Sequence, residues 1–216
     1  MRIMEQLGLE VRNSVRRKCT SLHNLIQQSK VLSTGDDCIH EANIRQMHDL
    51  IRERGYTATF FPVSRFMHYH DPQLWRDIVN SGSEIGYHTT QHTPSMSVDE
   101  LNADYHAFVE DVRHVLGDPG YTVRYVRPPE GAWDANWEQW AASRSLVTVR
   151  WNIVPPVDSV YIDGILRHDN GGGIVLLHTT LEDIAWLERI FPELEALRDS
   201  AGRPYTITSL SRAFND

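Results

Sequence analysis

From Val31 onward the sequence repeats one pattern: short runs of β-favouring residues end in polar loops and are separated by amphipathic stretches of roughly 10 to 18 residues. This alternation is typical of βα units, in which helices cross over between parallel strands. Seven strands are predicted, at or near residues 31–32, 57–63, 82–87, 123–126, 146–151, 173–177 and 205–208. No linker or low-complexity segment divides the series. We therefore expect one α/β domain over residues 31–216, either a barrel or an open doubly wound sheet.

The helices between these strands are marked by their ends. Ser97 and Glu100 form a capping box, and apolar side chains spaced three and four residues apart follow it. Asp71 before Pro72 marks a second start, because a capping carboxylate precedes a proline at the first helical position. Further helices are expected at residues 41–54, 134–143, within 158–168 and at 180–200. Pro192 would kink the last of these helices or start a second segment.

Composition limits what this domain can bind. With 216 residues the chain can bury a substantial core, so folding does not depend on a metal or a disulfide. The net charge of -8 argues against nucleic acid or an anionic membrane surface as the main partner. The two cysteines, Cys19 and Cys38, make neither a disulfide framework nor a cysteine-rich zinc site. Any metal must therefore use histidine and carboxylate ligands.

Residues 1–30 are an N-terminal lead-in with a loose helical pattern and no recognisable chemistry. Basic residues occur between positions 12 and 18, but no apolar stretch follows them, so no secretory signal is predicted. No apolar run approaches the ~20 residues that span a bilayer, so membrane insertion is not expected. Either the protein stays inside the cell that makes it, or its leader is not part of this sequence.

Two adjacent carboxylates, Asp36 and Asp37, follow the first predicted strand. Adjacent carboxylates repel each other, so a metal, an arginine or backbone amides must hold at least one of them ionised. The alternative is an ordinary polar turn, because Gly-Asp-Asp is common loop composition. Partners elsewhere in the chain decide between the two interpretations.

In parallel α/β folds the functional side chains gather at the C-terminal ends of the strands. Four predicted strand ends carry residues of catalytic type: Asp36 with Asp37, His88 with His92, Arg127, and His178. In a helical turn the spacing of His88 and His92 would place both imidazoles on one face, about 5 to 6 Å apart and able to share a cation. Alone, such a pair is as often two surface histidines. With an acidic strand end it makes the set of two histidines and one carboxylate that catalytic divalent metals require.

Five stretches, in their order, spacing and placement at strand ends, resemble the NodB-homology polysaccharide deacetylases, carbohydrate esterase family 4. They are residues 34–38, 57–61, 84–92, 127–131 and 174–178. The resemblance covers about residues 31–210. It implies a distorted (β/α)7 barrel, which agrees with the independent count of seven units, and a deacetylase catalytic domain at residues 31–216.

The resemblance also implies roles for the matched residues. Asp36 would be the general base, held in place by Arg127, and His178 would be the general acid. A divalent metal ion, zinc first, with cobalt, nickel or manganese as alternatives, would be held by Asp37, His88 and His92. The reaction implied is removal of acetyl groups from N-acetylated or O-acetylated sugars by a metal-activated water.

Three further residues would contact the acetylated carbohydrate. Leu176 would line the pocket for the acetyl methyl group, and the backbone amide of Glu130 would donate to the oxyanion. Trp133 follows the third motif closely enough to stack on a sugar ring. The family usually has tyrosine where this chain has Glu130, whose carboxylate could weaken the binding of acidic glycans.

The chain also departs from the family pattern. Gly35 replaces a phenylalanine and Cys38 a glycine beside the acidic pair. The fourth motif, a tryptophan followed by an aspartate, is not evident: Trp151 is present, but Asp158 lies one residue late as a partner for His178. Two alternatives therefore stay open, a catalytically silent glycan-binding member of the family and a non-sugar amide hydrolase of the same superfamily.

Overall fold

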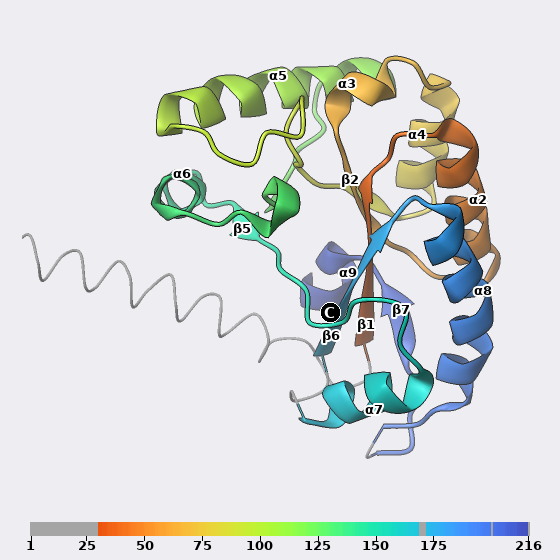
Figure 1. Cartoon of the computed structure of the whole chain (residues 1–216). Helices are drawn as coiled ribbons and strands as arrows, with labels where there is room; N and C mark the ends of the chain where they lie inside the picture. The colour runs from red at the N-terminus through yellow and green to blue at the C-terminus, as the bar shows by residue number, and fades with distance from the viewer. Residues whose placement is uncertain (1–29, 169–171, 200, 216) are drawn as a thin grey trace, which may run out of the picture.

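β1 (Lys30–Asp37) is the central strand of the computed structural model, which describes residues 30–168, 172–199 and 201–215 (Figure 1). β6 (Gly172–His178) runs parallel to β1 along most of its length, and β2 (Thr59–Pro62) runs parallel to its C-terminal half. β7 (Thr206–Thr208) pairs with the first residues of β1, and β3 (Glu84–Ile85) pairs with β2. The predicted lead-in lies outside the described residues, except for Lys30.

The remaining strands complete a ring. β4 (Tyr125–Val126) and β5 (Val147–Thr148) form a separate parallel pair. Single parallel pairings join it to the larger sheet on both sides, Tyr87 with Val126 and Ile153 with Val175. Parallel pairing therefore runs around the ring in the order β1, β2, β3, β4, β5 and β6, and β6 pairs with β1 again. The predicted distorted α/β barrel is confirmed, and the open doubly wound sheet is not the form adopted.

Helices cover the ring, and Figure 1 shows α2, α4 and α8 along one side of it. The longer helices are α2 (Glu41–Glu53), α4 (Pro72–Asn80), α5 (Val98–Leu116), α6 (Ala135–Ser143), α7 (Ser159–His168) and α8 (Leu181–Ala196). α5 begins with the predicted capping box, in which Ser97 and Glu100 each accept a backbone N–H from the other. Asp71 caps α4 by accepting the N–H of Gln73. Among the described residues, no helix combines the length and apolarity needed to cross a membrane.

β1 is longer than the sequence predicts. It pairs with β2 as far as Pro62 and with β6 as far as His178. Asp36 and Asp37 are therefore the last two residues of the strand, not part of the loop that follows. Pairing with β2 and β6 continues through the acidic pair, although Asp37 itself has left-handed backbone (φ 65°), and local composition does not reveal this pairing.

Helix lengths also differ from expectation in places. α3 (Ser64–Met67) and α9 (Leu210–Asn215) are too short for hydrophobic periodicity to indicate them. The last long helix, α8, ends at Ala196, and Pro192 lies inside it without dividing it. None of these differences changes where the strand ends meet.

Phe61 connects the hydrophobic core to that end of the barrel. Its ring is fully buried, and the guanidinium of Arg127 lies over it, 4.6 Å from the ring centroid. Gly86 packs against the same ring, and a Cβ added there would stand 2.3 Å from a carbon of Phe61. No side chain fits at that distance, so glycine is required by the close approach.

We expect Gly86→Ala to lower the free energy of unfolding by about 1 to 3 kcal/mol, because the added methyl group overpacks the Phe61 ring. Urea denaturation followed by circular dichroism measures the change. Gly164→Ala is the matched control: Gly164 lies in α7, and an added Cβ there meets nothing within 4 Å. This control should raise stability by about 0.5 to 1 kcal/mol, since alanine is the better helix former. Equal stability of Gly86→Ala and the parent protein would contradict the packing argument.

Candidate active site

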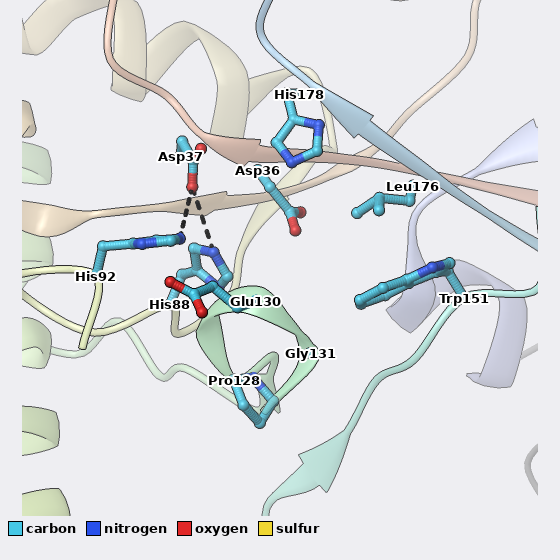
Figure 2. Close-up of a pocket in the computed structure, with 10 residues that line it drawn as sticks. All are labelled: Asp36, Asp37, His88, His92, Pro128, Glu130, Gly131, Trp151, Leu176 and His178. Carbon is cyan, nitrogen blue, oxygen red and sulfur yellow. Dashed lines mark ion pairs between the residues drawn. The ribbon is translucent and has the colours of Figure 1, made fainter. Parts of the chain in front are cut away.

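The strand ends converge on one pocket, drawn in Figure 2. It is lined by Asp36, Asp37, His88, His92, Pro128, Glu130, Gly131, Trp151, Leu176 and His178. These residues come from the ends of β1 and β6 and from the loops after β3, β4 and β5. The structure thus brings together the predicted acidic pair, both histidines predicted as metal ligands and the predicted general acid, and places Arg127 directly behind them.

Asp36 and Arg127 form a buried ion pair. Asp36 is 3% exposed and Arg127 is fully buried, with 2.7 Å between Arg127 Nη1 and Asp36 Oδ1. The same nitrogen donates to Thr34 Oγ1, and Nε donates to the carbonyl of Val149. Burial lowers the pKa of Arg127, and the neighbouring Asp36 charge opposes that effect. The Arg127 guanidinium therefore lies as a fixed positive charge behind the Asp36 carboxylate. It balances the negative charge of Asp36 where water does not reach.

Asp37 faces two imidazoles. Its Oδ1 lies 3.4 Å from His88 Nε2 and 3.3 Å from His92 Nε2, the two ion pairs dashed in Figure 2. That oxygen is buried and has no hydrogen-bond partner among the described residues. Burial would raise the pKa of Asp37, but the contacts with His88, His92 and His178 outweigh it and lower that pKa.

These three side chains fit a divalent cation. One ligand atom from each of Asp37, His88 and His92 lies within 4.8 Å of the others. The buried Asp37 oxygen needs a partner, and two imidazole nitrogens converge on the same point. Carboxylate and imidazole are the ligands that zinc and related ions bind in sites with open positions.

His88 is held in the form that binds a metal. Its Nδ1 lies 2.7 Å from the carbonyl oxygen of Arg127. A carbonyl only accepts, so Nδ1 carries a proton, which leaves Nε2, 3.4 Å from Asp37 Oδ1, as the nitrogen that can bind a cation. Burial, at 2% exposure, prevents the ring from turning. Arg127 therefore acts twice, through its side chain on Asp36 and through its backbone on His88.

The two histidines do not lie on a helical turn, which corrects the sequence expectation. The chain turns sharply instead, with left-handed backbone at Thr89 (φ 68°) and His92 (φ 60°). The rings nevertheless meet, with centroids 5.1 Å apart. Non-glycine residues with left-handed backbone cost about 1 kcal/mol or more each, so other contacts must hold this loop.

Asp104 of α5 holds the loop between the two histidines. Its carboxylate accepts the Thr90 N–H at 3.0 Å and the Tyr87 hydroxyl at 2.7 Å, and the Thr90 hydroxyl donates to it as well. Thr89 Oγ1 accepts the N–H of Thr93 from the other side. No sequence motif indicates this role, because Asp104 belongs to a helix that the sequence predicts only as core packing.

His178 has a carboxylate neighbour, but it is Asp183. The Asp183 carboxylate accepts the backbone N–H of His178 at 2.6 Å and lies 3.8 Å from the ring Nδ1. Asp158, the partner considered from the sequence, instead accepts the N–H of Tyr161 at the start of α7. Burial raises the pKa of Asp183, and the His178 N–H opposes the shift. The structure therefore favours Asp183 over Asp158 as the acidic neighbour.

The predicted substrate contacts divide in two. Glu130 and Leu176 line the pocket. Trp133 is not among the lining residues, and its indole N–H donates to Glu138 at 2.9 Å. Trp151 lines the pocket instead of Trp133. The guanidinium carbon of Arg127 lies 5.5 Å from the centroid of the Trp151 ring. The position of Trp151 as the last residue of a predicted strand is the signal that could have marked it.

The two departures beside the acidic pair have local explanations. A Cβ at Gly35 would stand 3.2 Å from the Phe60 ring, so an aromatic side chain already fills the space next to this glycine. Cys38 is fully buried, and its thiol donates to the carbonyl of Gly35. Burial raises the pKa of the Cys38 thiol well above its usual value, and the negative charges of Asp36 and Asp37 raise it further. The thiol is thus a neutral packing group.

The fold and pocket together define a parallel α/β barrel with a carboxylate and imidazole site for a cation at its strand ends. The chain belongs to the polysaccharide deacetylase family, whose model matches residues 26–149. It is 30% identical over 159 residues to a chitooligosaccharide deacetylase of Azorhizobium caulinodans, covering 70% of this chain and 74% of that protein. It is 26% identical over 159 residues to a peptidoglycan-N-acetylglucosamine deacetylase of Bacillus cereus, covering 68% of this chain and 56% of that protein.

Solved structures share the fold. A crystal structure of a peptidoglycan N-acetylglucosamine deacetylase superposes with a TM-score of 0.71 at 21% identity, over 88% of this chain and 90% of that one. A pseudoenzyme of carbohydrate esterase family 4 from Bacillus anthracis gives 0.69 at 17% identity, over 88% and 66%. At these identities the likeness concerns the fold alone.

We expect Asp104→Ala to weaken zinc binding about 10-fold to 100-fold, because the loop that carries His88 and His92 loses its anchor. Competition against a chromophoric chelator measures the affinity, and a thermal melt of the metal-free protein checks folding. Glu110→Ala is the control, an exposed acidic residue on the same helix. Unchanged affinity in a folded Asp104→Ala protein would contradict the anchoring role.

Proposed function

We propose that this protein is a metal-dependent deacetylase that removes acetyl groups from N-acetylated, or alternatively O-acetylated, sugars of an oligosaccharide or polysaccharide. One observation carries the proposal: a carboxylate paired with a buried arginine stands beside a separate Asp-His-His ligand set in one pocket. Membership of the polysaccharide deacetylase family supports the reaction class. Zinc is the metal we expect first, because the ligand set is one carboxylate and two imidazoles.

A divalent cation bound by Asp37, His88 and His92 would supply Lewis-acid activation of a water and of the acetyl carbonyl. The protein's own groups supply the proton transfers. Asp36 accepts the proton of the attacking water, with its charge balanced by Arg127. His178 gives a proton to the departing amine nitrogen, without which an amide C–N bond does not break near neutral pH.

The remaining pocket residues would orient the acetyl group. Leu176 and Trp151 offer apolar surface to the methyl group. The backbone N–H of Glu130 would donate to the carbonyl oxygen as it gains negative charge, which is the role the family resemblance implies. Asp183 would position His178, because its carboxylate accepts the His178 backbone N–H and lies 3.8 Å from the ring Nδ1.

Metal removal tests the reaction. We expect acetate release from N-acetylated chitooligosaccharides to stop after chelation and to return on adding zinc. Asp37→Ala and His92→Ala should each lose bound metal and at least about 100-fold in kcat/KM, since each removes a ligand. His106→Ala, an exposed histidine of α5, is the control for a lost imidazole. Full activity and full metal content in Asp37→Ala would show that the site is assigned wrongly.

Asp183→Asn tests the acid. We expect kcat to fall about 3-fold to 10-fold, because the proposed acid loses the charged group that accepts its backbone N–H and lies 3.8 Å from its ring. Glu182→Gln, the exposed neighbour on α8, removes the same charge without the contact. A rate equal to that of the parent protein in a folded Asp183→Asn protein would contradict the positioning role. Asp158→Asn should leave kcat as it is.

A further inference from the structure

Glu130 is the acidic group of the pocket that no other part of the described chain balances. Asp36 is paired with Arg127, and Asp37 faces two imidazoles. The Glu130 side chain lines the pocket, is exposed, and has no hydrogen bond or ion pair within the described residues. The ten lining residues include no lysine and no arginine. Glu130 therefore places at the pocket one negative charge without a protein partner in the described part of the chain.

The loop that carries Glu130 is firmly held. Pro128 and Pro129 are buried, and the N–H of Gly131 donates to the carbonyl of Pro128. A Cβ at Gly131 would stand 2.8 Å from the Trp151 ring, so the loop rests directly against that wall. Figure 2 shows Glu130 on the His88 side of the pocket and Trp151 on the other. The backbone that carries Glu130 is therefore fixed beside the pocket wall.

The position is also an unfavourable one for glutamate. Glu130 has a left-handed backbone, with φ 57° and ψ 11°. A residue with a long side chain is strained there, whereas glycine or asparagine would be tolerated. Local stability does not explain the residue. The carboxylate also stands outside the metal-ligand group, whose members among the described residues are Asp37, His88 and His92.

We propose that Glu130 makes the pocket selective by charge, so that it takes neutral or amine-bearing chitooligosaccharides and disfavours glycans with carboxylate groups. This inference rests on the proposed deacetylase function and names its substrate class. A carboxylate at the entrance repels a lactyl or peptide carboxylate of a peptidoglycan-type chain. It attracts the ammonium group of a sugar that has already lost its acetyl group, so partly deacetylated chains remain substrates.

The size of the effect follows from the exposure of the site. Two unit charges several ångströms apart in a partly exposed pocket change binding by about 3-fold to 10-fold. The effect should fade with salt, because the screening length falls from about 10 Å at 0.1 M to about 3 Å at 1 M. Selectivity by shape alone would not depend on salt in this way.

Three tetrasaccharides of equal length test the proposal: one fully N-acetylated, one with a single glucosamine, and one with a single N-acetylmuramic acid. We expect kcat/KM for the carboxylate-bearing chain, relative to the neutral one, to rise about 3-fold to 10-fold in Glu130→Gln. The relative value for the amine-bearing chain should fall. Glu188→Gln, an exposed glutamate of α8, is the control for the same charge change and should alter neither ratio.

Unchanged ratios in Glu130→Gln, or selectivity in the parent protein that is equal at 0.1 M and 1 M salt, would overturn the proposal. The salt series needs no variant, so a folding defect in Glu130→Gln leaves a decisive test. If no tetrasaccharide releases acetate, the deacetylase function itself fails. Calorimetric binding of the same three chains then decides the charge selectivity separately, and equal affinities for the neutral and carboxylate-bearing chains would reject it.

Discussion

The buried ion pair between Arg127 and Asp36 is the interaction on which the whole pocket depends. Both side chains are removed from water, so each charge requires the other, and removing one partner of such a pair costs about 3 to 5 kcal/mol. The guanidinium also bonds to Thr34 on β1 and to Val149 after β5, while the Arg127 carbonyl fixes the tautomer of His88. Arg127 therefore links two sides of the barrel. It also contacts both the proposed base and one of the proposed metal ligands. A change that moves Arg127 would disturb the proposed base, Asp36, and the proposed metal ligand, His88, together.

Around this pair the backbone is strained, and the strain is concentrated at the pocket. Asp37, Thr89, His92 and Glu130 all have left-handed backbone without being glycine. Each such residue persists only where surrounding contacts impose it. For the histidine loop those contacts come from Asp104 and from backbone bonds to the start of α3, where Ser64 N–H donates to the Thr89 carbonyl. The helices on the outside of the barrel thus hold the geometry that the pocket uses.

The sequence predicts the strand ends well because both signals involved are local. A β-rich run and the polar residue that ends it are adjacent in the chain, so Asp36, His88 and His178 are found without knowing the topology. Tertiary contacts decide the features that were missed. The acidic pair lies within β1 because of its neighbours, and the turn between His88 and His92 depends on a distant helix. Asp183, and not Asp158, lies beside His178 because α8 begins just after β6. The spacing of the fourth motif does not predict where that helix begins.

The departures from the family pattern bear on whether the site is intact, because a barrel of this shape also occurs in a pseudoenzyme. Gly35 and Cys38 flank the acidic pair, and either could have turned it away from the pocket. Instead Phe60 from the next strand fills the space beside Gly35, and the Cys38 thiol packs against the Gly35 carbonyl. Cys38 adopts a left-handed backbone, φ 52°, that usually favours glycine, so the turn after the pair is kept at some cost. Because Asp36 pairs with Arg127 and Asp37 faces both imidazoles, the acidic pair is directed into the pocket with Gly35 and Cys38 beside it. Glu130 is different in kind, because its side chain stands in the pocket itself, where it acts on what enters.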